Sequence, residues 1–363
     1  MKRGSVLAGL LVLSLMLGGC DLWTEGYYHN VVPHMQEHES ASDEKIRVST
    51  YMELRNALEK LVEECAQKRV IYTAGIAQEN METYMQMAIA YVRLNNPIGA
   101  YALEGVSYDI GTNVGVQAVA VEFTYSHLRS EIMQIKRTQS MEEAIEVITT
   151  ALNNCDAGVV LQVENFKDID LTQLIQDYVD ETPWKCMEMP QVAEMVYPDH
   201  GNQRVIELSF TYQTSRETLR VMQETVETVF SSAEMYVRGN PNDRGKYAQL
   251  YSFLMERHNY KIETSITPAY SLLYHGVGDE KAFATVYAAM CRQAGLECRV
   301  VYGTRRGERW CWNLIQDGDA YYHLDLLECV SAGGFRLKSA GEMEDYVWDY
   351  SAYPEIVQPD KNN

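Results

Sequence analysis

The chain has 363 residues, of which 46% are hydrophobic and 23% are charged. This composition is that of a globular protein and excludes collagen-like, low-complexity and wholly disordered chains. The formal net charge of −20 would repel nucleic-acid phosphates and anionic lipid headgroups. The sequence therefore predicts no nucleic-acid partner, and its length indicates two or three folded units.

The N-terminus carries a short apolar segment. Two basic residues precede an apolar run over residues 6–17, and the run leads into the motif LGGC at residues 17–20. The run is too short to cross a bilayer, which takes about 20 residues. The pattern resembles bacterial lipoprotein signals, and this resemblance implies that residues 1–19 are removed and that Cys20 carries a diacylglycerol. We therefore predict an extracytoplasmic lipoprotein that is anchored to the lipid bilayer through acylated Cys20, at the cell surface or the periplasmic face.

Residues 20–45 are polar and acidic, and they have no sustained hydrophobic period. This pattern predicts a lipidated tether rather than a folded unit. Three histidines, His29, His34 and His38, lie in this stretch. Their irregular spacing favours a solvated linker over a metal site.

The cysteines that follow Cys20 have no metal-ligand spacing. None forms a CxxC pair or a Cys/His pattern, so we expect most of them to be small buried hydrophobic residues and predict neither a metal site nor a cofactor. In an oxidising compartment one or two disulfides are possible, and the sequence does not give their pairing. These cysteines are Cys65, Cys155, Cys186, Cys291, Cys298, Cys311 and Cys329.

Two stretches of the chain after residue 45 resemble each other. Residues 119–125 read VAVEFTY and residues 206–212 read IELSFTY, and both alternate with period two. Such alternation predicts a half-buried strand. We therefore expect two tandem small α/β repeats, at residues 46–137 and 138–235.

The same order of elements is expected in both repeats. Apolar residues at helical spacing lie upstream of the strands, over residues 54–65 and 144–155, and follow them over residues 128–135 and 219–229. A short strand and a further helix separate the upstream helix from the strand pair. Each repeat is therefore predicted to run helix, strand, helix, strand, strand, and then to continue into an amphipathic helix.

The C-terminal third carries several motifs in a fixed order. Residues 269–303, the WCWN motif at 310–313 and the HLD motif at 323–325 resemble the core of bacterial transglutaminase-like proteins of the papain-like cysteine superfamily. The resemblance implies an α+β domain over residues 236–356, followed by a tail at 357–363. It also implies a catalytic cysteine at a helix N-terminus, a histidine on a strand, and an aspartate that orients the histidine.

The expected catalytic residues are not all present. In this family the cysteine lies four residues before an alanine and fifteen before a glycine, and both Ala284 and Gly295 lead back to Glu280. The family's histidine precedes a small residue and Trp-Asn, which places Trp310 at its position. Only the third member is kept, as Asp325. Because neither a carboxylate nor an indole can replace the original pair, we predict a vestigial triad and a catalytically inactive domain.

Two other cysteines could be considered as the nucleophile. Cys291 lies eleven residues further along the expected helix, about 16 Å away along its axis. Cys311 is expected on the strand face opposite to Trp310. Neither is expected to replace the missing thiol, although a misaligned nucleophile would leave an active transglutaminase or peptidase-like enzyme as an alternative.

The remaining polar residues of this region allow a different chemistry. Glu280 and Asp325 could act as acid and base in a re-purposed hydrolase. His323 would share a strand face with Asp325 and could add metal ligation. We favour an α+β protein that binds or scaffolds at the cell envelope, with an envelope protein, peptide or glycan as its partner. The ligand pocket expected from the sequence comprises Glu280, Trp310, Trp312, Asn313, His323 and Asp325.

Overall fold

A computed structural model describes residues 45–262 and 265–353. The expected signal peptide, the lipidated Cys20, the three tether histidines and the tail at 357–363 lie outside the described residues. Among the described residues, β1 (Ile46–Arg47) belongs to one unit of the chain and those from 48 onward belong to a second. No helix among the described residues is long and apolar enough to cross a membrane.

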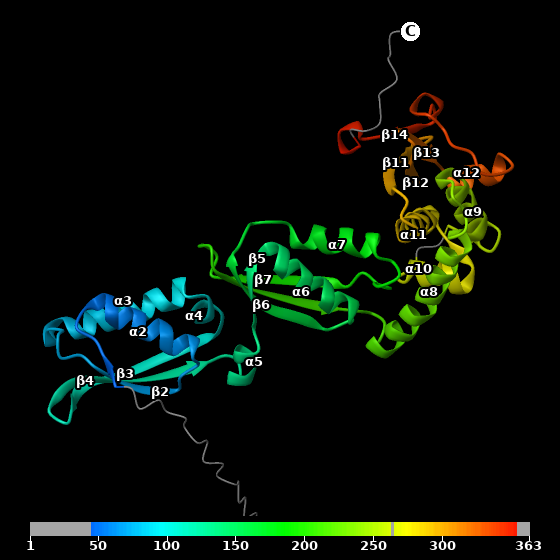
Figure 1. The fold of residues 1–363 in the computed structure, drawn as a ribbon. Coiled ribbons are helices and arrows are strands. Elements are labelled where there is room, and N and C mark those ends of the chain that lie inside the picture. Colours follow the sequence, from blue (N-terminus) through cyan, green and yellow to red (C-terminus); the bar gives the residue numbers. More distant parts are fainter. Residues whose placement is uncertain (1–44, 263–264, 354–363) are drawn as a thin grey trace, which may run out of the picture. The chain divides into compact units, whose positions relative to one another are not determined.

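The first sheet of the second unit has β4 at its centre. β4 pairs antiparallel with β2 on one side and with β3 on the other. Helices α2 and α3 cover one face of this sheet (Figure 1). The elements are α2 (Tyr51–Glu63), β2 (Lys68–Tyr72), α3 (Gln78–Asn95), α4 (Pro97–Ala102), β3 (Leu103–Asn113) and β4 (Val116–Tyr125).

The second sheet has the strand order β5-β6-β8-β7. β8 pairs antiparallel with β6 and β7, whereas β5 pairs parallel with β6. Apolar residues of α6 and α7 pack against this sheet (Figure 1). The elements are β5 (Lys136–Ser140), α6 (Met141–Asn153), β6 (Gly158–Asn165), α7 (Leu171–Glu181), β7 (Gln191–Tyr197) and β8 (Arg204–Thr211).

Local features correspond between the two sheets. Phe123 lies on β4 and Phe210 on β8. β4 lies between β2 and β3, and β8 lies between β6 and β7. Cys65 and Cys155 each follow the first helix and have positive φ values of 51° and 52°. The order helix, strand, helix, strand, strand is found around both sheets, with α4 as an additional helix in the first and β5 as an additional strand before the second. A superposition of the two units is the measurement that decides whether they form a repeat.

The helices that follow the two strand pairs differ from the expectation. α5 (Arg129–Met133) is only five residues long, so the apolar pattern that extends to Ile135 is not one continuous helix. α8 (Arg216–Val237) has 22 residues, and the expected boundary at residue 235 falls inside it. The apolar side of α8 packs in the same core as Phe283 of the C-terminal region. Tertiary packing therefore ties α8 to the C-terminal domain.

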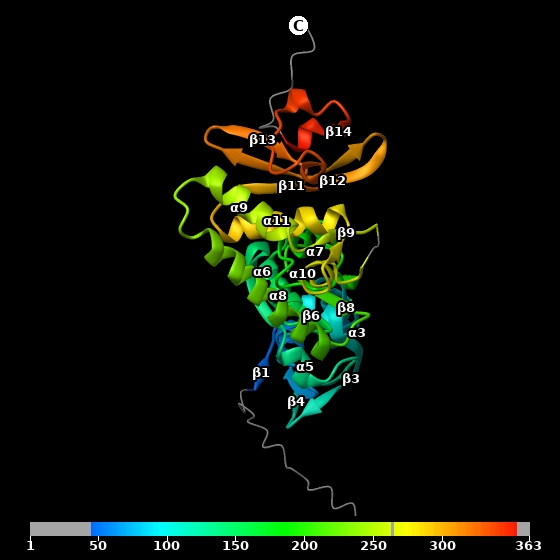
Figure 2. The ribbon, with the colours of Figure 1, turned by 90° about the vertical axis from the view of Figure 1, so that its right-hand side faces the viewer.

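The C-terminal region contains a third sheet, of order β13-β12-β11-β14, with all neighbours antiparallel. Figure 2 shows α11 against one face of this sheet and the last described part of the chain, residues 340–353, on the other face. Ten consecutive residues of α11, from 282 to 291, are buried, because this helix is enclosed on all sides. The strands are β11 (Cys298–Arg305), β12 (Glu308–Asp317), β13 (Ala320–Leu324) and β14 (Tyr346–Trp348).

The remaining elements surround α11 and the third sheet. Together with the two N-terminal sheets they confirm the predicted α+β class. The seven described cysteines are free thiols. The elements are α9 (Asp243–Met255), β9 (Asn259–Tyr260), α10 (Pro268–His275), β10 (Val277–Gly278), α11 (Glu280–Gln293), α12 (Leu326–Ser331), η1 (Ala340–Glu342) and η2 (Tyr350–Ala352).

Candidate functional site

Glu280 is the first residue of α11. The helix is capped by Asp279, whose side chain accepts a hydrogen bond from the backbone N–H of Ala282 at 2.8 Å. The partly exposed Glu280 accepts a long hydrogen bond, 3.4 Å, from the hydroxyl of Tyr260. Burial and the neighbouring Glu280 carboxylate raise the pKa of Tyr260. The helix N-terminus thus holds carboxylates where the family resemblance expects a thiol.

Trp310 lies on β12, and its indole N–H points at Asp325. Its Nε1 atom donates a hydrogen bond to Oδ2 of Asp325 over 2.8 Å. The Trp310 ring also lies 6.1 Å from the ring of Tyr260, measured between centroids, and the Tyr260 hydroxyl in turn donates to Glu280. Indole is a hydrogen-bond donor without acid–base capacity near neutral pH. Trp310 therefore contacts the aspartate without being able to move a proton.

Asp325 is saturated with hydrogen-bond donors. Besides Trp310, its Oδ2 atom accepts from the Tyr346 hydroxyl at 2.6 Å and from Arg305 at 3.3 Å. Its Oδ1 atom accepts from the backbone N–H groups of Leu327 and Glu328 and so caps α12. A carboxylate offers about four lone-pair positions, and the side chain is 3% exposed. No acceptor position is left for an attacking water or a substrate.

Arg305 and Tyr346 complete the surroundings of this carboxylate. The guanidinium of Arg305 lies 5.4 Å from the Trp310 ring centre and 5.3 Å from that of Tyr346. Burial raises the pKa of Tyr346, and the adjacent Asp325 charge raises it further. The sequence reasoning did not find these two partners of Asp325, because they lie about twenty residues away along the chain and no local motif marks them.

His323 and Asp325 lie on the same side of the third sheet, in agreement with the expectation from the sequence. Asp325 follows the end of β13 and caps α12. Trp310 and Trp312, two residues apart on β12, donate hydrogen bonds to Asp325 and His323 respectively, so the two side chains have separate partners. Nδ1 of His323 accepts a hydrogen bond from the Trp312 indole at 2.9 Å, so the imidazole is neutral and carries its proton on Nε2. Burial lowers its pKa to about 4. No cluster of three or more metal-ligating side chains exists in the part of the chain that the structure describes.

The thiols of Cys291 and Cys311 are poor nucleophiles. Cys291 is buried in the middle of α11, and its burial raises the pKa well above the usual value. Cys311 has its pKa raised to about 12, first by burial and then by the Glu280 carboxylate. A thiol attacks as thiolate, so neither side chain is activated at neutral pH.

Most of the predicted pocket residues cannot line an open pocket. Trp312, Asn313, His323 and Asp325 are between 0% and 3% exposed, and this part of the expectation needs correction. The physical reason is that they hold the domain together. The side chain of Asn313, for example, donates to the backbone carbonyl of Ala284 at 2.9 Å and so ties β12 to α11.

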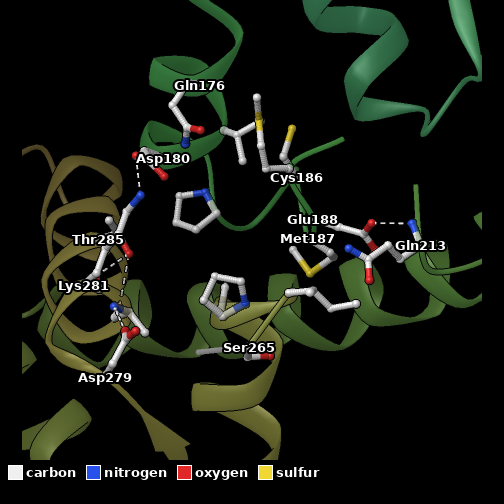
Figure 3. Close-up of a pocket in the computed structure, with 17 residues that line it drawn as sticks. Gln176, Asp180, Cys186, Met187, Glu188, Gln213, Ser265, Asp279, Lys281 and Thr285 are labelled. Atoms are coloured by element: carbon white, nitrogen blue, oxygen red, sulfur yellow. Dashed lines mark hydrogen bonds and ion pairs between the residues drawn. The ribbon is translucent and has the colours of Figure 1, made fainter. Parts of the chain in front are cut away.

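Two cavities among the described residues border α11. One, of about 320 Å³, is enclosed by α7 and the segment after it together with α10 and α11 (Figure 3). A second, of about 410 Å³, shares Gln176 and Asp180 with the first. Neither is lined by Glu280 or Trp310. No local sequence pattern marks these cavities, because their walls come from segments about one hundred residues apart.

Three solved structures are similar to parts of the chain, all at low identity. A TGase is 9% identical with a TM-score of 0.28, and the match covers 62% of this chain and 68% of that one. A candidate cysteine protease from Cytophaga hutchinsonii is 12% identical with a TM-score of 0.26, covering 44% and 70%. A candidate protease from Parabacteroides distasonis is 9% identical with a TM-score of 0.22, covering 60% and 35%. Since all three scores are below 0.5, no functional conclusion rests on them.

The C-terminal region matches a known family of proteins. No curated protein matches the chain. Residues 231–360 match the Transglutaminase-like superfamily. This range begins inside α8, in agreement with the packing of that helix in the C-terminal core. The C-terminal part of this protein is therefore a transglutaminase-like domain.

Proposed function

We propose that the transglutaminase-like domain is catalytically inactive and that the protein binds or scaffolds at the cell envelope. The observation that carries this proposal is the hydrogen bond from Trp310 to Asp325. In Cys–His catalysis the aspartate orients the histidine, which in turn activates the thiol. Here an indole takes the histidine's place against the aspartate, and Glu280 occupies the helix N-terminus.

The re-purposed hydrolase remains the rival function. A general acid or base must be able to reach a substrate or a water molecule. Asp325 is buried, and its oxygens already accept five hydrogen bonds. This geometry disfavours Asp325 as one member of a catalytic carboxylate pair.

The location at the envelope rests on the N-terminal motif alone. Residues 17–20 read LGGC, which resembles the acylation site of bacterial lipoproteins. We propose that acylated Cys20 anchors the chain to the lipid bilayer outside the cytoplasm. An inactive domain on such an anchor would present a binding surface to an envelope protein, peptide or glycan.

The purified protein tests the loss of catalysis directly. We expect no incorporation of a fluorescent primary amine into a glutamine-containing peptide and no cleavage of casein. Pretreatment with iodoacetamide is expected to leave both results unchanged, because Glu280 stands where the reactive thiol is expected and the described cysteines are buried or partly buried. Amine incorporation that iodoacetamide abolishes would refute the proposal. Hydrolysis that Glu280→Gln abolishes in a folded protein would instead support the rival function.

A further inference from the structure

The cavity of about 320 Å³ between α7 and α11 has the size of a small-ligand site. Its walls come from residues between 176 and 213 and from residues between 265 and 285 of the transglutaminase-like domain. The ion pair between Asp180 and Lys281, at 2.8 Å, joins the two walls. Figure 3 shows this ion pair at one side of the cavity and Glu188 with Gln213 at the other. Because Glu280 and Trp310 are not among the lining residues, the cavity is distinct from the vestigial centre.

The interior of the cavity is apolar. Side chains without charge form most of the wall between its two polar ends. Two of them are methionines, whose unbranched thioether chains adapt to ligands of different shape. Such a wall favours a ligand with an apolar body. The main apolar lining residues are Pro183, Met187, Met189, Ile266 and Pro268.

The charge in the cavity is unbalanced. Glu188 is 4% exposed, and the hydrogen bonds that its two oxygens accept from described residues come from the backbone N–H groups of Gln213 and Thr214, at 2.5 and 3.1 Å. Among the described residues, neither Glu188 nor Asp279 has a cationic partner within ion-pair distance, and Lys281 is engaged by Asp180. A buried carboxylate without a cation is costly. A cationic ligand would relieve that cost.

We propose that this cavity binds an ammonium group attached to an apolar body, with Glu188 as its counter-ion. The chemistry is that of a small apolar amine or of the free amino terminus of a peptide whose first residue is apolar. This assignment goes beyond the proposed function, because it concerns a different site and holds whether or not the domain is catalytic.

Calorimetric titration of the full-length protein in detergent tests the ligand class. Leucinamide and the peptide Leu-Ala-Ala-amide each carry an ammonium next to an apolar side chain, and at least one of them is expected to bind. N-acetyl-leucinamide, which has the same body without the charge, is expected to bind about tenfold more weakly or not at all. Equal binding of leucinamide and the peptide assigns the ligand to small amines. Stronger binding of the peptide assigns it to peptide amino termini.

Two variants test the residues that form the site. Glu188→Gln removes the counter-ion, and Ile266→Lys places a like charge in the wall at a side chain that is 48% exposed. Both are expected to weaken binding of the better ligand about tenfold. Ile262→Lys is the matched control, because Ile262 is 85% exposed and outside the cavity, and it should bind as the wild type does.

Three results would overturn the assignment. The first is that neither amine binds the folded protein at about 10 mM, a concentration far above the micromolar range of specific ligands. The second is that N-acetyl-leucinamide binds as tightly as leucinamide. The third is that a folded Ile266→Lys variant binds the better ligand as the wild type does. The Ile266→Lys measurement tests the assignment even if the Glu188→Gln variant does not fold. None of them bears on the loss of catalysis, which the amine-incorporation assay measures separately.

Discussion

The indole N–H of Trp310 and the carboxylate of Asp325 are joined by a hydrogen bond of 2.8 Å. In a Cys–His enzyme the aspartate accepts such a bond from the catalytic imidazole, which then exchanges protons with the substrate. An indole keeps the bond and the packing but cannot exchange the proton. We infer that this pair now serves the stability of the domain, and its energetics can be measured.

Trp310→Phe removes the N–H donor and keeps an aromatic ring. Because the hydrogen bond goes to a buried carboxylate, we expect the free energy of unfolding to fall by about 1–3 kcal/mol. Urea denaturation measures the change. Tyr321→Phe is the control, since the structure gives the Tyr321 hydroxyl no hydrogen bond among the described residues, and it should cost less than about 0.5 kcal/mol. A Trp310→Phe variant as stable as the wild type would contradict the prediction.

The donors to Asp325 are expected to act together. Trp310 and Tyr346 both donate to Oδ2, so removing either one changes the carboxylate that the other contacts. Combining Trp310→Phe with Tyr346→Phe should therefore give a loss of stability that differs from the sum of the single losses by about 0.5 kcal/mol or more. Denaturation of the four proteins of this double-mutant cycle measures the difference. Strict additivity would show that the two donors are independent.

Restoring the two lost residue types should restore a reactive thiol. In the double variant Glu280→Cys with Trp310→His, the new thiol stands at the N-terminus of α11, and the helix dipole favours its thiolate. We expect stoichiometric alkylation by iodoacetamide at neutral pH, whereas the wild type reacts far more slowly. Mass spectrometry of the alkylated protein measures the extent.

Glu280→Cys alone is the control for this restoration. It provides the thiol without the imidazole, so its reaction should be slower and should rise toward higher pH. If the single and double variants react at the same rate, Trp310 does not occupy the position of the catalytic histidine. If the wild type reacts as fast as either, another cysteine is accessible.

The neutral, buried His323 makes stability depend on pH. Its pKa is about 4 in the folded protein, against 6.5 for the unperturbed side chain. The unfolded chain therefore binds the proton first as the pH falls. The contribution of His323 to the free energy of unfolding is lost as the pH falls from about 6.5 to about 4, and it does not change further below pH 4. The shift corresponds to about 3 kcal/mol, as an order of magnitude.

The variant His323→Gln isolates this contribution. The loss of unfolding free energy between pH 6.5 and pH 4 should be about 3 kcal/mol smaller in the variant than in the wild type, because the titrating group is gone. His275→Gln, which replaces an exposed histidine on α10, is the control. The prediction is wrong if the three proteins lose the same free energy over this range.

Cys20→Ala tests the membrane anchor. If the LGGC motif at residues 17–20 directs acylation, the variant should lose all label from a fatty-acid probe and should be released from the membrane fraction. Metabolic labelling followed by fractionation measures both. Cys65→Ala serves as the control, because Cys65 follows α2 in the folded part of the chain and is buried. Undiminished label in Cys20→Ala would exclude the anchor.

The sequence alone was sufficient for features that depend on local order. Alternation at residues 119–125 and 206–212 correctly predicted strands, since period two survives wherever one face of a sheet is buried. The order of motifs from residue 269 to 325 identified the transglutaminase-like domain, because residue identities at fixed spacing are themselves a property of the sequence. The register of those motifs also singled out Glu280, Trp310 and Asp325.

The tertiary structure decided what those residues contact. The sequence could not show that Arg305 and Tyr346 meet at Asp325, because both lie about twenty residues from it along the chain. It also could not show that the strand ends at Leu324 and that Asp325 caps the next helix. It could not show which core α8 joins. An amphipathic pattern indicates that one face of a helix is buried, but it does not identify the elements against which that face packs. The cavity around Glu188 exists only because segments distant in the chain fold against each other, and no local pattern encodes such a meeting.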